Sequence, residues 1–255
     1  MALSLSFNRE QTRAALTFAH PKGNILTADI VRELRAALED LTRARHLRLL
    51  TIEGAGADFS FGASVPEHAP GAIDRVLPEM HALVVDLLEC ATPTAAVVRG
   101  RCLGGGFELA LSCDLIFASD DAVFGLPEIA LGVFPPAASV LLPRRVGWSR
   151  ATSAALAGDA RPAAEWRAAG LLELVAPAAE LPAAIDAWFD RTLARYSAEA
   201  LGHATRAIRA PLVDAARREL PAIERLYLRE LMASHDAAEG IRAFMEKRAP
   251  GWKDE

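Results

Sequence analysis

Two glutamates in apolar surroundings are the residues of this chain best suited to acid–base chemistry. Glu108 is flanked by phenylalanine, leucine and alanine, and Glu128 directly follows Pro127. Burial of an unpaired carboxylate is costly and raises its pKa toward neutrality, where the group can both accept and donate a proton. The sequence therefore predicts a pair of acid–base groups. The alternative for Glu108 is an exposed position on a helix.

A glycine triplet, Gly104 to Gly106, precedes Glu108 and follows the apolar run Ala95–Val98. Glycine lets the backbone approach a ligand closely, and the first amides of a helix are unpaired and lie at the positive end of its dipole. Such a turn can stabilise an anion or a developing oxyanion. The alternative is a close-packed turn between a strand and a helix.

The elements that must position these groups follow from hydrophobic periodicity and from glycine and proline. An α/β part comes first, and a loop at the end of a strand is where ligands bind in such folds. An all-helical tail follows. We expect strands at residues 14–19, 46–53, 95–98, 114–118 and 171–177, and helices at 28–44, 74–88 (kinked or starting late at Pro78), 148–157, 161–169 (Pro162 in its first turn), 182–195, 198–209, 212–233 and 236–247.

Composition limits the classes of function. The chain has 255 residues, 52% of them hydrophobic, and a net charge of −5, which is typical of a soluble globular protein and argues against nucleic-acid or anionic-membrane partners. Cys90, Cys102 and Cys113 lie in or beside apolar runs, so we expect buried free thiols and a cytoplasmic location. Neither a metal-ligand cluster nor a nucleotide-binding glycine motif occurs, so we expect no metal.

Three stretches resemble the enoyl-CoA hydratase/isomerase (crotonase) superfamily. They are LGGGFELALSCDLIFASDDAVFGLPEIALGVFP from Leu103, FSFGAS from Phe59 and SHDAAEGIRAFMEKRAP from Ser234, and the likeness covers nearly the whole chain. The resemblance implies the crotonase fold, an α/β spiral of ββα units. It implies a core over residues 1–195 and a helical region over 196–255 that forms trimers or dimers of trimers.

The resemblance also implies a reaction. Water adds to an α,β-unsaturated acyl-CoA thioester, and the amides of Ala63 and Gly105 stabilise the enolate oxygen. Glu108 deprotonates the water, and Glu128 protonates the carbon next to the carbonyl. Coenzyme A belongs to the substrate, so no separate cofactor is implied.

Further residues are implied to bind the thioester. The PKGN turn is one residue shorter than the family's, and the family's Gly-Ala-Asp ends in Ser64 here, which a backbone donor tolerates. The alternatives are a surface turn at 59–63, a packing or surface role for His68, and a solvated helix with one core aromatic at the end of the chain. The binding residues are Lys22, Gly23, Asn24, Ser60, Gly62, Ser64, His68, Gly104, Pro127, Phe134, Pro135, Pro136, Phe244 and Lys247, the last two reaching a neighbouring subunit's ligand in relatives.

Two segments look like those of the family's cyclic dienoyl-CoA hydratases, namely GVFPPAAS at 132–139 and VPEHAP at 65–70. Prolines in place of glycines stiffen a pocket wall, which suits a compact ring. The alternatives are a straight-chain hydratase, or an isomerase or ring-opening hydrolase with the same oxyanion hole.

A more remote alternative is an RNA-binding relative with a basic helix. Interleaved glutamates at 219, 224 and 230 favour a solvated, ion-paired face instead. The basic residues concerned are Arg206, Arg209, Arg217, Arg218, Arg225 and Arg229.

Overall fold

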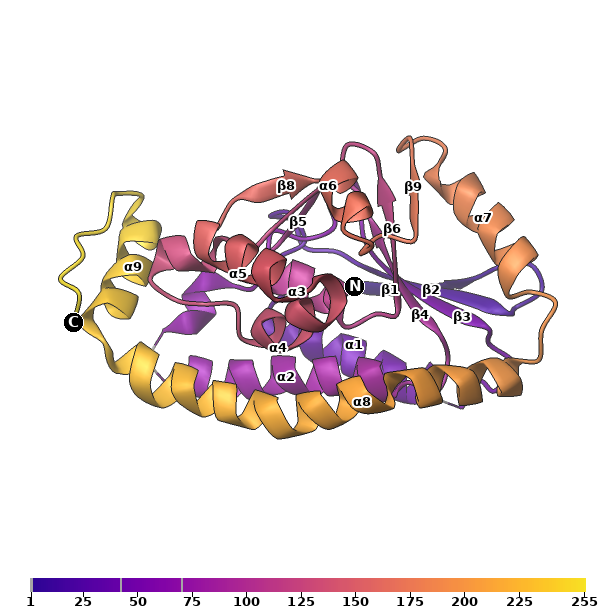
Figure 1. The fold of residues 1–255 in the computed structure, drawn as a ribbon, viewed down its shortest axis with the longest axis horizontal. Helices are drawn as coiled ribbons and strands as arrows, with labels where there is room; N and C mark the ends of the chain where they lie inside the picture. The colour runs from indigo at the N-terminus through magenta and orange to yellow at the C-terminus, as the bar shows by residue number, and fades with distance from the viewer. Residues whose placement is uncertain (1, 42, 70) are drawn as a thin grey trace.

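The computed structural model describes residues 2–41, 43–69 and 71–255. A six-stranded sheet lies at its centre (Figure 1), in the order β1-β2-β3-β4-β6-β9. β1 and β2 pair antiparallel, and every later pair is parallel. Its strands are β1 (Leu3–Phe7), β2 (Arg13–Phe18), β3 (Leu49–Gly54), β4 (Thr94–Val98), β6 (Leu115–Ser119) and β9 (Leu174–Ala176).

The central strands are largely apolar because helices cover both faces of the sheet. Leu50 and Ala96 point toward α1 (Ala28–Leu41), α2 (Ile73–Glu89), α3 (Gly105–Leu111) and α4 (Pro136–Val146). On the opposite face, Phe117 meets Trp188 of α7 (Leu181–Thr192), with ring centroids 4.9 Å apart. The predicted α/β part is confirmed. α2 begins at Ile73, so a late start at Pro78 is wrong.

A second, three-stranded sheet was not predicted. β5 (Arg101–Leu103) and β7 (Val123–Gly125) are parallel, and β8 (Ala160–Pro162) is antiparallel to β7. α5 (Trp148–Ala157) agrees with the prediction, and the helix expected at 161–169 is present but begins two residues later, at Ala163. Pro162 ends β8 with ψ 155° and precedes α6 (Ala163–Ala168), because proline lacks a donor and suits an extended position.

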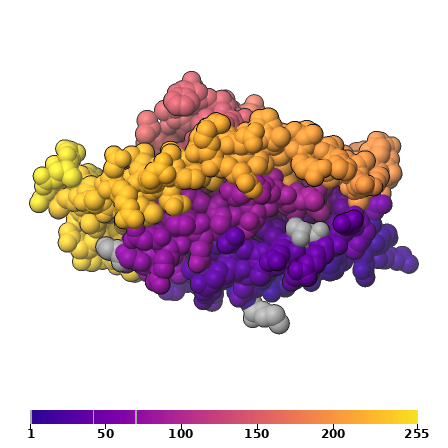
Figure 2. Space-filling view, turned by 90° about the horizontal axis from the view of Figure 1, so that it is seen from below, coloured from indigo at the N-terminus to yellow at the C-terminus, as the bar shows by residue number. Residues whose placement is uncertain are grey.

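The C-terminal part is helical, as predicted, but α8 (Ala198–Arg225) is one continuous helix where two were expected. Pro211 and Pro221 each remove a backbone donor, yet the helix continues because it packs along α2 and α4. Figures 1 and 2 show α8 running the length of the molecule beside α2. A π-helical turn, η3 (Leu226–Glu230), a 3₁₀ turn, η4 (Leu231–Ala233), and α9 (His235–Glu246) follow. The division at residue 195 stays a prediction.

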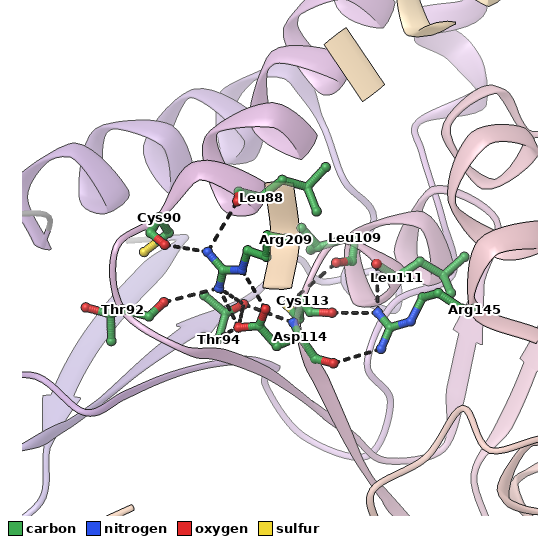
Figure 3. A network of polar contacts seen from close by, with 10 residues as sticks. All are labelled: Leu88, Cys90, Thr92, Thr94, Leu109, Leu111, Cys113, Asp114, Arg145 and Arg209. Carbon is green, nitrogen blue, oxygen red and sulfur yellow. Dashed lines mark hydrogen bonds and ion pairs between the residues drawn. The ribbon is translucent and has the colours of Figure 1, made fainter. Parts of the chain in front are cut away.

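Arg209 of α8 was expected on a solvated face, and this is wrong (Figure 3). The side chain is buried, pairs with Asp114 and donates to the carbonyl oxygens of Leu88 and Thr92, each 3.3 Å away. A guanidinium has enough donors to satisfy the carbonyls that follow α2. The other basic side chains of α8 with carboxylate partners are Arg217 with Glu89 and Arg218 with Glu219, and in η3 Arg229 pairs with Asp74.

The cysteine prediction is confirmed, since Cys90, Cys102 and Cys113 are all buried and free. In the part of the chain that the structure describes, every helix is too short or too polar to cross a membrane.

Candidate active site

A cavity of about 310 Å³ opens between the loop at 61–68, α2, the start of α3, η2 (Pro127–Leu131) and the C-terminal helix α9. Ile73, Val76, Leu77 and Met80 of α2 give it an apolar wall. Ten of the residues predicted for the site line it. They are Gly62, Ala63, His68, Gly104, Gly105, Glu108, Pro127, Glu128, Pro136 and Phe244.

The backbones of Ala63 and Gly105 come together at this cavity. A Cβ on Gly105 would lie 3.1 Å from the Ala63 nitrogen. Leu26 donates to the Gly62 carbonyl at 2.9 Å and accepts from the Ser64 amide at 3.1 Å, so the Ala63 amide is left outside this pairing. Gly105 is the first residue of α3, where the amide has no helical partner. Among the described residues, neither amide has a protein acceptor.

Glu108 lies in α3 and is 6% exposed. Its Oε1 accepts from the Ala138 amide at 2.9 Å, which is one of the unpaired donors at the start of α4. Burial raises the pKa of Glu108 to about 7, and hydrogen bonds from the amides of Ala138 and Ala137 work against this rise. The carboxylate is therefore fixed in position and can titrate near neutral pH.

Two sets of hydrogen bonds connect α3 and α4, one at the N-terminus of α4 and one at the C-terminus of α3. Glu108 of α3 binds the N-terminus of α4, and Arg145 of α4 donates to the carbonyls of Leu111 and Asp114 at the C-terminus of α3, at 2.8 and 2.9 Å (Figure 3). Each contact compensates unpaired backbone groups of a helix end. The short helix α3 therefore presents Glu108 from a rigid support.

Glu128 approaches from η2 and lies against Gly104. A Cβ on Gly104, whose φ is +49°, would come within 2.6 Å of Glu128 Oε1, so a side chain there would displace the carboxylate. Oε2 of Glu128 is buried and has no hydrogen-bond partner among the described residues. Burial and then repulsion from Glu108 raise the pKa of Glu128 to about 8. The two glutamates thus differ in environment and repel one another.

The segment 132–139 was predicted as a loop forming the pocket wall. Pro136 does line the cavity, but it is also the first residue of α4, and Pro135 is its N-cap. Phe134 does not line the cavity and instead packs edge-on against Tyr227, with ring centroids 5.3 Å apart. In the other segment, Val65 and His68 line the cavity, while Pro70 lies outside the described residues.

Several predicted binding residues support the site loop from outside the cavity. Ser60 is fully buried, donates to the Asn24 carbonyl at 2.8 Å and accepts from the Gly62 amide at 3.1 Å. The Asn24 side chain donates to the carbonyls of Ala55 and Asp58, both at 2.8 Å. These contacts fix the turn and the loop that presents Ala63.

Lys22, Gly23 and Lys247 were also predicted to bind the thioester, and they are not among the residues that line the cavity. Lys22 is exposed, and Gly23 lies against the ring of Phe61. The guanidinium carbon of Arg101 lies over the same ring, 5.2 Å from its centroid. Lys247 is exposed and ends α9 in a left-handed conformation.

The carbonyl oxygen of Ser64 accepts a hydrogen bond from Nδ1 of His68, at 2.9 Å. That contact fixes the tautomer of neutral His68 and directs Nε2 away from the loop backbone.

Sequence reasoning missed two parts of the site. The amides of Ala137 and Ala138 were missed, although proline followed by alanines is a signal for a helix start. Tyr227 of η3 also lines the cavity, and its segment carries no motif that marks it. Clusters of three or more metal-ligating side chains are not found among the described residues.

Comparison with known proteins agrees with this architecture. Residues 8–255 match the family model described as enoyl-CoA hydratase/isomerase. The cyclohexa-1,5-dienecarbonyl-CoA hydratase of Thauera aromatica is 43% identical over 99% of this chain and 97% of its own. The 2,3-dehydroadipyl-CoA hydratase of Escherichia coli is 35% identical over 98% and 94%.

Solved structures show the same fold. An enoyl-CoA hydratase from Mycobacterium avium subsp. paratuberculosis superposes with a TM-score of 0.87 at 30% identity, covering 100% of this chain and 99% of that one. An enoyl-CoA hydratase/isomerase from Pseudoalteromonas atlantica gives 0.84 at 27% identity over 99% and 100%. The predicted crotonase fold is confirmed, and the chain belongs to the enoyl-CoA hydratase/isomerase family.

Proposed function

We propose that this protein adds water to the double bond of an α,β-unsaturated acyl-CoA thioester, with cyclohexa-1,5-diene-1-carbonyl-CoA as its preferred substrate. The observation that carries this proposal is one cavity lined by two glutamates of raised pKa and by two backbone amides that have no acceptor among the described residues. Base, acid and oxyanion donors are the groups that hydration of a conjugated thioester requires.

In the proposed mechanism the amides of Ala63 and Gly105 donate to the thioester oxygen. Glu108, unprotonated, takes one proton from water as the oxygen bonds to carbon, and the electron pair of the double bond moves toward the thioester as an enolate. Glu128, protonated, then delivers its proton to the carbon next to the carbonyl. The net change is the addition of one water to the thioester. Transfer of the proton from Glu108 to Glu128 then restores the starting protonation state of the pair. The coenzyme A belongs to the substrate, and these steps need no further cofactor.

The pKa values of the pair fit this division of labour. Burial raises the pKa of Glu108 to about 7 and that of Glu128 to about 8, and repulsion between the two carboxylates favours a pair that holds one proton at intermediate pH. The mechanism places this proton on Glu128. Only this state has a base and an acid together. Activity should fall at lower pH because Glu108 is protonated, and at higher pH because Glu128 is charged.

We therefore expect a bell-shaped dependence of kcat/KM on pH, with its maximum between the two apparent pKa values of the pair. Glu128→Gln should abolish the alkaline limb in whatever activity remains, whereas the exposed Glu165→Gln should leave both limbs in place. The measurement is initial hydration rate in constant-ionic-strength buffers. A profile without an acidic limb would exclude an unprotonated glutamate as the base.

A cyclic acyl group is favoured by the substrate named for the Thauera relative and by the stiff, apolar cavity. Pro136 begins a helix there, so this part of the wall cannot yield easily to a long chain. We expect kcat/KM for the cyclic dienoyl thioester to exceed that for long linear trans-2-enoyl thioesters by at least about tenfold, which corresponds to about 1.4 kcal/mol. A panel of purified thioesters, followed by mass spectrometry, tests this.

Efficient turnover of the long linear thioesters without turnover of the cyclic one would contradict the cyclic assignment and leave a straight-chain hydratase. Rearrangement of a thioester without a change of mass would indicate an isomerase. Release of a ring-opened product would indicate the hydrolase alternative.

We also propose a trimer or a dimer of trimers. The support is the family membership and the large apolar side chains exposed on the C-terminal helices, Ile208 at 80% and Phe244 at 55%. Light scattering at micromolar concentration should give three or six times the mass of 27.3 kDa. A monomeric mass would refute this. A cytoplasmic location is part of the proposal and is supported by the three free thiols.

A further inference from the structure

Tyr227 lines the cavity and lies in the π-helical turn that follows α8. It is 1% exposed, and its ring packs at 75° against Phe134. Ile73 and Leu77 of α2 belong to the same apolar cluster. π-Helical turns insert an extra residue into a helix and are frequent at functional sites, because they redirect a side chain.

Tyr227 lines the cavity, and no hydrogen bond of its hydroxyl to another described residue is found. A phenol at this depth normally has one, so the hydroxyl is left to interact with whatever occupies the cavity. Burial, followed by the charges of Glu108 and Glu128, raises the pKa of Tyr227. The group therefore keeps its proton and remains a donor.

The other polar groups described around the cavity have other partners or roles, so the oxygen of the attacking water still lacks a hydrogen-bond donor. Glu108 accepts a proton from water, Glu128 delivers its proton to carbon, and the amides of Ala63 and Gly105 donate to the thioester oxygen. Nδ1 of His68 donates to the Ser64 carbonyl, and burial lowers the pKa of this histidine, so the neutral ring has no second donor.

Arg248 also lines the cavity but is held by Glu239 and Glu246. A water that gives a proton to Glu108 and bonds to carbon still has a lone pair to be satisfied.

We propose that Tyr227 donates a hydrogen bond to the oxygen of the attacking water, and hence to the hydroxyl of the hydrated thioester. This inference rests on the proposed hydration. It assigns to Tyr227 a contact that orients the nucleophile and, in the reverse direction, stabilises the departing hydroxyl. The ring supports Phe134, and the hydroxyl contacts the reacting oxygen.

The test is Tyr227→Phe, which keeps the ring and removes only the hydroxyl. We expect kcat to fall about 10- to 100-fold, the usual range for a lost hydrogen bond in a buried site. In a Glu108→Gln background, where product turns over far more slowly, the variant should bind the hydroxylated thioester about tenfold more weakly. It should bind saturated cyclohexanecarbonyl-CoA unchanged, because this ligand lacks the oxygen that Tyr227 contacts.

Tyr196→Phe is the matched control, since Tyr196 is 47% exposed and is the other of the chain's two tyrosines. It should behave as the wild type. Unchanged kcat and product affinity in Tyr227→Phe would overturn the inference while leaving the proposed function intact. Equal weakening of both ligands would also overturn it, because this indicates a packing role. A wild-type protein that hydrates no thioester would instead refute the proposed function.

Discussion

Replacing Glu108 or Glu128 by glutamine is expected to lower kcat by about 10²- to 10⁴-fold, the range typical of a lost general acid or base. Glutamine keeps the shape of each side chain and removes the group that titrates. Both positions are constrained, Glu108 by the Ala138 amide at 2.9 Å and Glu128 by its contact with Gly104, so neither loss is easily compensated. The Kd of the saturated thioester should change only modestly, because binding does not require proton transfer.

The double variant should lose less than the product of the two single losses, because residues that act as one unit are not additive. Glu165→Gln, on the exposed surface of α6, controls for the loss of one carboxylate. Steady-state kinetics and thioester binding together separate catalysis from affinity. A kcat within a few-fold of wild type for either single variant would remove that residue from the mechanism. Loss with Glu108→Gln alone would indicate an isomerase or a hydrolase.

Replacing Gly105 by alanine is expected to lower kcat by about 10²- to 10³-fold, the cost of losing one oxyanion donor. The added methyl group would lie 3.1 Å from the Ala63 nitrogen, in the space between the two donors. The backbone of Gly105 is helical and not left-handed, so alanine adds no backbone strain, and its close contact with Ala63 requires only a small shift of the loop. Activity should therefore be lost while the thermal midpoint stays close to that of the wild type.

Gly251→Ala is the matched control, because a Cβ at that position meets its nearest side-chain atom at 3.9 Å. It should keep both activity and stability. The measurements are kcat on the preferred thioester and the thermal unfolding midpoint. Full activity in Gly105→Ala would contradict an oxyanion site at this turn. A large fall in the midpoint would assign the glycine to packing.

The sequence allowed the prediction of those parts of the site that depend on local chemistry. The glycine triplet at 104–106 and the glutamates at 108 and 128 are close together along the chain, and the structure places Gly104, Gly105 and both glutamates around one cavity. Their catalytic roles stay predictions. The start of α4 was missed because the Pro135–Pro136 pair was taken as a loop, although proline is also favoured in the first turn of a helix.

Contacts between segments that are far apart in the chain could not be predicted from local sequence patterns. Arg209 lies in a helix rich in charged residues, and only the folded chain shows that Asp114 and the carbonyls after α2 enclose it. Tyr227 is separated by a long stretch of chain from Pro136, the lining residue that precedes it, and the continuous helix α8 brings it to the cavity. Pro211 suggested a break there, but tertiary packing outweighed the local cost of proline.

The most direct test of the central claim is the fate of water oxygen. The wild-type protein is incubated with cyclohexa-1,5-diene-1-carbonyl-CoA in water enriched in heavy oxygen, and the thioester is analysed by mass spectrometry. We predict a product that gains one water and carries the heavy oxygen in its acyl group, formed by Gly251→Ala as by the wild type and formed far more slowly by Glu108→Gln and Glu128→Gln. Free coenzyme A and a heavy carboxylate, or a thioester that rearranges without gaining water, would contradict hydration by this site.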